Sequence, residues 1–263
     1  AGDSEIPKRG GQAVTVPGAV DGWIKAHARF GSLPLEQLLE PAAAVAERGF
    51  AASRHTRASF LACEADMREK GGFAIFGIDR SPNLYDRVRQ PRLSETLRDI
   101  ARTQGRCLYE GPLAREMAAA TQEWGGWLME EDLAAYSAEW VEPLSTRFRH
   151  LDILTAPPPS QGFALLAALR AVESVSPQPL DPFAASTAHL LAEVANAALS
   201  LRDRLNGDRG SSKIPEAIEA LSRFRSDFDP GLHRPIAFHP GGSRKGDTAH
   251  FAVVDASGGA VSL

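Results

Sequence analysis

Apolar residues recur at helical spacing over most of the chain, and this pattern predicts a mostly helical protein. The longest helix is predicted over residues 186–205, where one face carries Leu190, Val194, Ala198, Leu201 and Leu205. Shorter helices are predicted over residues 94–103, 112–124, 161–173 and 215–225, with another that begins at Glu130.

One further helix is predicted between Ser32 and Gly49. Ser32 would be its N-cap, Pro34 would lie in its first turn, and Gly49 would end it. Pro41 falls inside this run, and a proline has no backbone N–H to donate to the preceding turn. We therefore expect Pro41 to kink or split the helix.

Strands are predicted in few places. Residues 13–16 form a short candidate, and residues 147–155 alternate weakly. The clearest pair comes last: residues 248–255 and 260–263 are apolar runs joined by the turn residues 257–259. Two such runs around a Ser-Gly-Gly turn predict a β-hairpin.

Composition narrows the classes of function. The 263 residues carry 29 Lys and Arg against 33 Asp and Glu, a net charge of −4. Nucleic-acid-binding proteins usually carry a clear basic excess, so we expect no nucleic-acid partner. No segment approaches the roughly 18 consecutive apolar residues of a membrane-spanning helix. We expect a soluble protein, and its compartment stays open between cytoplasm, periplasm and exterior.

The metal-binding residue types are sparse. Cys63 and Cys107 are too few for a disulfide-rich scaffold or a cysteine-based zinc site. One disulfide or none is compatible with the count, and two unpaired thiols is the favoured interpretation. The seven His residues form no His-x-x-x-His or His-Glu-x-x-His pair. We expect neither a metal nor a cofactor.

Thr248 carries the most specific candidate chemistry. It begins a predicted strand after a loop that contains Gly, Ser and Lys. Cleavage of the Asp247–Thr248 bond would make Thr248 an N-terminal residue, with its hydroxyl as nucleophile and its α-amine, of ordinary pKa about 7.7–8.0, as base. From the local sequence alone, a β-branched residue that simply begins a strand is the commoner interpretation.

Several segments carry a resemblance to a known family. The most specific are residues 157–162, Pro-Pro-Pro-Ser-Gln-Gly, and residues 247–255, which begin Asp-Thr-Ala-His-Phe. The others are residues 16–23, 30–50, 90–97, 108–111 and 125–136. In this order, and across nearly the whole chain, they resemble the γ-glutamyltranspeptidase (γ-glutamyltransferase) family of the N-terminal-nucleophile hydrolase superfamily.

The resemblance implies an α+β fold, the four-layer αββα sandwich of that superfamily, incomplete in this chain and with a large helical lobe. Residues 1–263 would be a partial family domain, with residues 1–247 in the large subunit and residues 248–263 beginning the small subunit. Asp247 and Thr248 would form the cleavage site, and Thr248 would be the catalytic nucleophile. After self-cleavage the two subunits would stay paired and act on γ-glutamyl small molecules such as glutathione, with water or an amine as acceptor.

Two features separate this chain from the family pattern. The family's second Thr is Ala249 here, so the reaction rate or the substrate is expected to differ. The family's first segment, with the Arg that binds the substrate carboxylate, has no counterpart before Ala1, and the family's remaining substrate contacts and Gly-Gly oxyanion hole would follow Leu263. We therefore expect a piece of a proenzyme that is inactive by itself. A cephalosporin-acylase-like amidase and an uncleaved, non-catalytic homologue or fragment are the alternatives.

Overall fold

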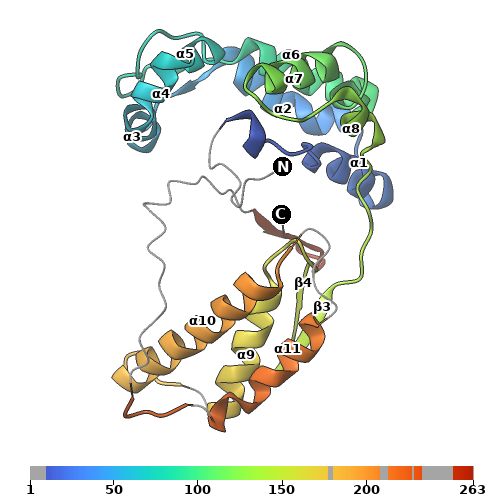
Figure 1. Ribbon diagram of the computed structural model, residues 1–263. Coiled ribbons are helices and arrows are strands. Elements are labelled where there is room, and N and C mark those ends of the chain that lie inside the picture. Colours follow the sequence, from blue (N-terminus) through green and yellow to red (C-terminus); the bar gives the residue numbers. More distant parts are fainter. Residues whose placement is uncertain (1–9, 177–179, 208–212, 227, 233–250, 263) are drawn as a thin grey trace. The chain divides into compact units, whose positions relative to one another are not determined.

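The chain divides into two compact units, residues 1–140 and residues 141–263 (Figure 1). The computed structural model describes residues 10–176, 180–207, 213–226, 228–232 and 251–262. Helices dominate both units, and the strands pair into three separate two-stranded antiparallel sheets in the described part of the chain. This content agrees with the expected α+β class.

The first unit is almost entirely helical. Its helices are α1 (Ala19–Phe30), α2 (Leu35–Arg48), α3 (Arg54–Ala62), α4 (Glu64–Glu69), α5 (Gly72–Ile75), α6 (Pro91–Thr103), α7 (Pro112–Glu123) and α8 (Glu130–Ala135), with short 3-10 helices at Gly11–Ala13 and Arg106–Leu108. Strands β1 (Phe50–Ala51) and β2 (Arg87–Val88) pair in register Phe50 to Val88.

Helices α2 and α6 lie against each other in this unit. Arg98 of α6 donates to both carboxylate oxygens of Glu40, at 3.1 and 2.9 Å, and to Glu47 at 2.8 Å. A planar guanidinium suits this forked geometry, and the two carboxylates raise the pKa of Arg98. A hydrophobic cluster at α7 and α8 contains the buried residues Ala114, Ala118, Leu128 and Leu133.

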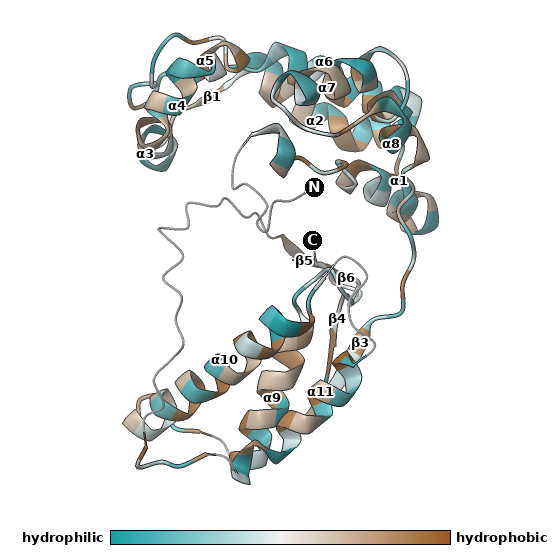
Figure 2. Cartoon of the chain, in the orientation of Figure 1, coloured by the Kyte–Doolittle hydropathy of each residue, from teal (hydrophilic) through white to brown (hydrophobic). Residues whose placement is uncertain are grey.

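The second unit is built around α9. Its elements are β3 (Leu144–Phe148), β4 (Leu151–Thr155), α9 (Phe163–Val175), α10 (Ala185–Leu205), α11 (Ile214–Ala220), a 3-10 helix at Leu221–Ser226, and β5 (Ala252–Val254) with β6 (Ala260–Ser262). Helix α9 contacts α10, α11 and β3. Figure 2 shows its apolar character along most of its length. The core here contains Phe163, Leu166, Ala167, Leu201, Ile214 and Ile218.

The periodicity predicts most long helices correctly. Helices α6, α7, α8, α9 and α10 lie where expected, with shifts of a few residues at their ends. On α10 the predicted apolar face is buried at Leu190, Val194, Ala198 and Leu201. The predicted helix over residues 215–225 is in fact α11 followed by the 3-10 helix Leu221–Ser226.

Pro41 does not split the helix, because Leu35–Arg48 is one helix with Pro41 inside it. The missing N–H leaves the carbonyl of Gln37 without its usual partner, and Gln37 is exposed, where water can satisfy it. Pro34, without a side-chain cap, takes the N-cap position predicted for Ser32. Gly49 ends the helix with φ 79°, as predicted.

Two strand predictions are wrong. Residues 13–16 form no strand, because no other strand pairs with them within the described residues, and an isolated extended segment lacks the hydrogen bonds that hold a strand. Residues 147–155 are not one strand but most of a hairpin whose turn lies at Arg149 and His150. Arg149 adopts φ 56°, and its N–H donates to Glu173 of α9 at 2.8 Å.

The four tryptophans do not form core. Trp23, Trp124, Trp127 and Trp140 are each at least 45% exposed. Trp140 acts as a loop anchor, since its ring meets that of Phe30 edge to face at 5.7 Å.

Candidate functional site

The predicted catalytic pair, Asp247 and Thr248, lies outside the described residues. The structure therefore leaves their assignment as a prediction. The nearest described part of the chain is the β5–β6 hairpin, which begins four residues after Thr248 and confirms the predicted hairpin. Its register pairs Ala252 with Ser262, Val253 with Val261, and Val254 with Ala260.

Asp255 organises the turn of this hairpin. Its carboxylate accepts hydrogen bonds from the N–H of Ser257 at 2.8 Å, the hydroxyl of Ser257 at 2.7 Å and the N–H of Gly259 at 2.8 Å. Gly258 supplies the left-handed conformation that the turn requires, with φ 87°. These donors, the Ser257 hydroxyl first, lower the pKa of Asp255 because they stabilise the carboxylate.

Both faces of the hairpin are apolar and exposed. Val253 and Val261 lie on one face, and Val254 and Ala260 lie on the other. The three valines are 55–72% exposed. Strands that are apolar on both sides are typical of sheets that are covered on both sides.

The segment 157–162, the other specific region of resemblance, connects β4 to α9 and is held by several contacts. The hydroxyl of Ser160 accepts from the N–H of Gly162 at 3.2 Å, so Ser160 stabilises a local turn and is not the N-cap, which is Gly162. Gln161 accepts from Arg202 at 3.1 Å. A Cβ on Gly162 would collide with the hydroxyl of Thr155, so only glycine fits there. These contacts indicate a structural connection.

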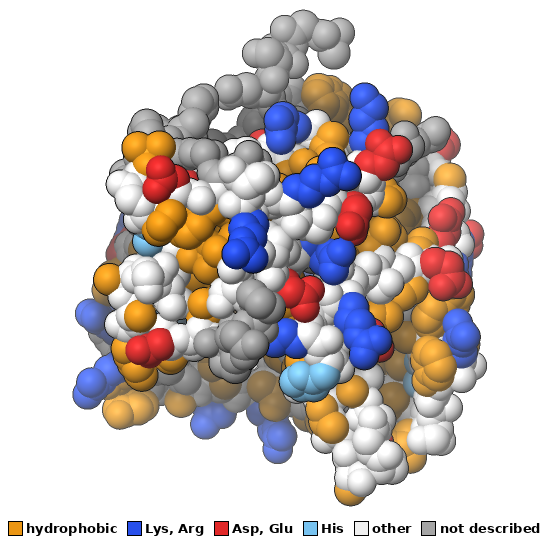
Figure 3. Space-filling view, turned by 90° about the horizontal axis from the view of Figure 1, so that it is seen from below, with side chains coloured by type: hydrophobic (Ala, Val, Ile, Leu, Met, Phe, Trp, Pro, Cys, Tyr) orange, Lys and Arg blue, Asp and Glu red, His pale blue; other side chains and the backbone are white. Residues whose placement is uncertain are grey.

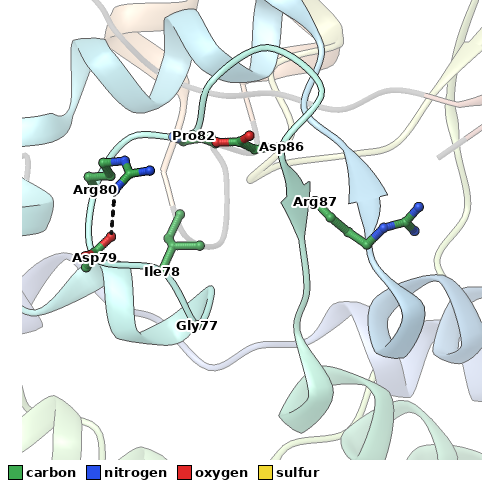
Figure 4. Close-up of a pocket in the computed structure, with 7 residues that line it drawn as sticks. All are labelled: Gly77, Ile78, Asp79, Arg80, Pro82, Asp86 and Arg87. Carbon is green, nitrogen blue, oxygen red and sulfur yellow. Dashed lines mark ion pairs between the residues drawn. The ribbon is translucent and has the colours of Figure 1, made fainter.

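A separate pocket of about 450 Å³ lies in the first unit, where no predicted site residue falls (Figure 4). It is lined by Gly77, Ile78, Asp79, Arg80, Pro82, Asp86 and Arg87. Its charged groups already have partners within the chain. Arg80 pairs with Asp79 at 3.9 Å, Asp86 accepts from the N–H of Asn83 at 2.8 Å, and Arg87 donates to the carbonyl of Gly49 at 3.1 Å. The lining contains no Ser, Thr, Cys, Lys or His side chain, and no sequence motif marks it.

The described residues offer little other chemistry. Within these ranges, no three His, Cys, Asp or Glu side chains gather in a way that could hold a metal ion. Cys63 and Cys107 are both free thiols, as favoured from the sequence. No helix among the described residues is long and apolar enough to cross a membrane. Basic and acidic side chains lie interspersed on the face shown in Figure 3.

Comparison with known proteins decides the family. The family model described as γ-glutamyltranspeptidase matches residues 1–263, the whole chain. This chain belongs to the γ-glutamyltranspeptidase family. The match confirms the family resemblance inferred from the ordered segments.

Similar proteins support the same family. The chain is 32% identical to the glutathione hydrolase-like YwrD proenzyme of Bacillus subtilis, over all of this chain and 50% of that protein. It is 31% identical to the acylase ACY 1 proenzyme of a Pseudomonas species, over 96% of this chain and 47% of that protein. It also resembles the crystal structure of γ-glutamyltranspeptidase from Helicobacter pylori, with TM-score 0.81 and 25% identity over 89% of this chain and 69% of that one. The chain thus spans about half the length of these curated relatives.

Proposed function

We propose that this member of the γ-glutamyltranspeptidase family is the part of a proenzyme that carries its cleavage site, Asp247–Thr248, and its nucleophile, Thr248. The observation that carries this proposal is the family match over all 263 residues, which includes this pair and the hairpin after it. Residues 1–247 would belong to the large subunit, and residues 248–263 would begin the small subunit. The two would remain paired after cleavage.

Maturation would proceed by an N-to-O acyl shift. The hydroxyl oxygen of Thr248 attacks the carbonyl carbon of Asp247, the peptide C–N bond breaks, and the freed amine takes up the hydroxyl proton. Water then hydrolyses the resulting ester, leaving a carboxylate on Asp247 and restoring the Thr248 hydroxyl. The product has both a nucleophile and a free α-amine on one residue, with the amine's ordinary pKa near neutrality.

The mature Thr248 would attack the carbonyl of a γ-glutamyl amide such as glutathione. Its α-amine accepts the hydroxyl proton and passes it to the departing amine, which leaves a γ-glutamyl ester on Thr248. Water releases glutamate from this ester, whereas an acceptor amine takes the γ-glutamyl group. Both steps need two hydrogen-bond donors that stabilise the oxyanion. We assign no residue of this chain to that role.

The same proposal includes the four-layer αββα sandwich. The β5–β6 hairpin supports it, because Val253 and Val254 point to opposite faces and both are exposed. In a sandwich, a strand pair of this kind has one face toward the second sheet and the other toward a layer of helices. Cleavage before Thr248 would place the nucleophile at the start of this strand.

An acylase activity on other amides is the second candidate. The 31% identity to the acylase ACY 1 proenzyme favours it, because that protein is as similar to this chain as the glutathione hydrolase-like relative. The mechanism at Thr248 would be the same, and only the acyl group would differ. Full-length protein assayed with γ-glutamyl-anilide and with glutaryl-amide substrates separates the two, since each candidate requires turnover of its own substrate.

Intact mass of the full-length protein under denaturing conditions tests the nucleophile. We expect two polypeptides, one of which begins at Thr248, and a single uncleaved polypeptide from the Thr248→Ala variant. Ser257→Ala is the matched control, because it removes a hydroxyl from the same hairpin and should leave cleavage intact. A wild-type protein that stays uncleaved and turns over neither substrate would support the non-catalytic alternative and end the enzyme proposal.

A further inference from the structure

Three charged side chains of α1, spaced four residues apart, contact the segment that follows α8. Asp21, Lys25 and Arg29 lie on one face of the helix, since residues four apart are neighbours on a helix surface. The segment they meet, residues 137–140, is the last part of the first unit before the chain enters the second (Figure 1). We call these three side chains and residues 137–140 the α1 latch.

Both backbone polar groups of Ala138 bind to α1 side chains. Its N–H donates to the carboxylate of Asp21 at 2.7 Å, and its carbonyl accepts from the ammonium of Lys25. Lys25 also donates to the hydroxyl of Ser137 at 2.5 Å and pairs with Asp21 at 3.3 Å. The Asp21 side chain is only 14% exposed, so solvent competes weakly for these bonds.

Arg29 holds the end of the segment through aromatic rings. Its guanidinium carbon lies 4.6 Å from the centre of the Trp140 ring and 5.1 Å from that of Phe30. The two rings meet edge to face, with an interplanar angle of 86°. Cation–π and edge-to-face contacts are both attractive in this geometry.

We infer that the α1 latch fixes the point at which the chain leaves the first unit. Helix α8 ends at Ala135 and β3 begins at Leu144, so residues 136–143 connect them. The latch holds this connection as far as Trp140 and leaves residues 141–143, the start of the second unit, outside its contacts, with the φ angle of Pro143 restricted by its ring. A shorter free connection has fewer conformations and gives a protease less backbone to bind.

Cleavage by glutamyl endopeptidase, which cuts after Glu, tests the latch in the full-length protein. Glu139 lies inside the latch, and Glu173 in α9 is a reference site that the latch does not touch. In Lys25→Met and Asp21→Ala we expect cleavage after Glu139 to become about tenfold faster, the effect of losing roughly one protecting hydrogen bond. Cleavage after Glu173 should not change.

Lys70→Met is the matched control, because Lys70 is the C-cap residue of α4 and is exposed, away from the latch. Asp21→Asn, which keeps an acceptor for Ala138, should restore most of the protection that Asp21→Ala loses. If the Lys25 or Asp21 variants fail to fold, Arg29→Gln decides the question, since it alters only the exposed ring contact. Cleavage after Glu139 at the wild-type rate in the variants, or equal acceleration at Glu139 and Glu173, would overturn the inference.

Discussion

A Cβ on Gly126 would lie 2.5 Å from the carbonyl oxygen of Gly11, and a Cβ on Gly11 would lie 2.5 Å from the amide nitrogen of Gly126. The two backbones therefore meet where neither residue can carry a side chain. Hydrogen bonds hold them there: Gly11 donates to the carbonyl of Trp124 at 3.1 Å, and Gly126 donates to that of Thr121 at 2.8 Å. The start of the described chain is thereby fixed to the end of α7.

Gly126→Ala should destabilise the protein by about 1–3 kcal/mol, because backbone atoms rather than flexible side chains must move to admit the methyl group. The free energy of unfolding from urea denaturation measures this change. Gly22→Ala is the control, since a Cβ there has nothing within 4 Å and Gly22 lies inside α1. The control should be neutral or stabilising by about 0.5–1 kcal/mol. Equal effects of the two substitutions would contradict the close approach.

Tyr109 caps α1 from a distant part of the chain. Its hydroxyl accepts from the N–H of Asp21 at 3.0 Å and donates to the carbonyl of Pro17 at 2.8 Å. Asp21 lies in the first turn of α1, where N–H groups have no partner within the helix, and the N-cap residue Gly18 has no side chain to offer. Burial raises the pKa of Tyr109, which keeps the donating proton in place.

Tyr109→Phe should lower the free energy of unfolding by about 1–3 kcal/mol, since it removes two hydrogen bonds of about 0.5–1.5 kcal/mol each while the ring remains. Tyr136→Phe is the control. Its ring stacks on Tyr109 at 5.8 Å, but its hydroxyl makes no hydrogen bond with the residues that the structure describes. We expect that variant to differ from wild type by no more than about 0.5 kcal/mol. A larger loss in Tyr136→Phe than in Tyr109→Phe would refute the capping role.

Two adjacent leucines on α9, one buried and one exposed, test which face of the helix packs into the core. Leu166 is fully buried in the core of the second unit, whereas Leu165 is 55% exposed. Leu166→Ala should cost about 2–5 kcal/mol through lost burial and the cavity left behind. Leu165→Ala should cost about 0.5 kcal/mol or less. Thermal and urea unfolding of the two variants give the comparison, and similar losses would show that the α9 face is assigned wrongly.

The sequence predicts those helices and strands that are determined by residues close together in the chain. Helices α9 and α10 repeat an apolar stripe over several turns, so their position and buried face follow from spacing. The hairpin β5–β6 has both strands and its turn residues in one short stretch. The short helices over residues 54–75 escaped prediction, because each offers too few turns for an apolar stripe.

The features that the sequence could not predict depend on contacts between residues that are far apart in the chain. The two-residue strands β1 and β2 exist only because Phe50 meets Val88 across an intervening group of helices. Arg149 in this turn has a positive φ angle, which is uncommon for residues other than glycine. The residue type at this position therefore does not predict the turn. Thr248 is a different case: the local pattern favours an ordinary strand residue, and its assignment as nucleophile stays a prediction that rests on the family resemblance of the whole chain.

Acid should disorder the β5–β6 hairpin through Asp255. Its pKa in the folded chain is lowered from the ordinary value of 3.8, so the carboxylate is stabilised by folding. The contribution is therefore fully present above pH 3.8 and is lost as the pH falls through the lowered folded pKa. Carbon-13 NMR titration of the carboxyl group, followed together with the methyl shifts of Val253 and Val261, measures both events on one sample.

Ser257→Ala tests the cause of this shift. It removes the hydroxyl donor, the largest contribution, and leaves the N–H donors of Ser257 and Gly259 in place. We expect the pKa of Asp255 to rise part of the way toward its ordinary value, and the valine methyl shifts to change at correspondingly higher pH. In Asp255→Asn the methyl shifts should lose this acid transition altogether, since no carboxyl group remains to titrate. An acid transition that persists unchanged in Asp255→Asn would mean that another group controls the hairpin.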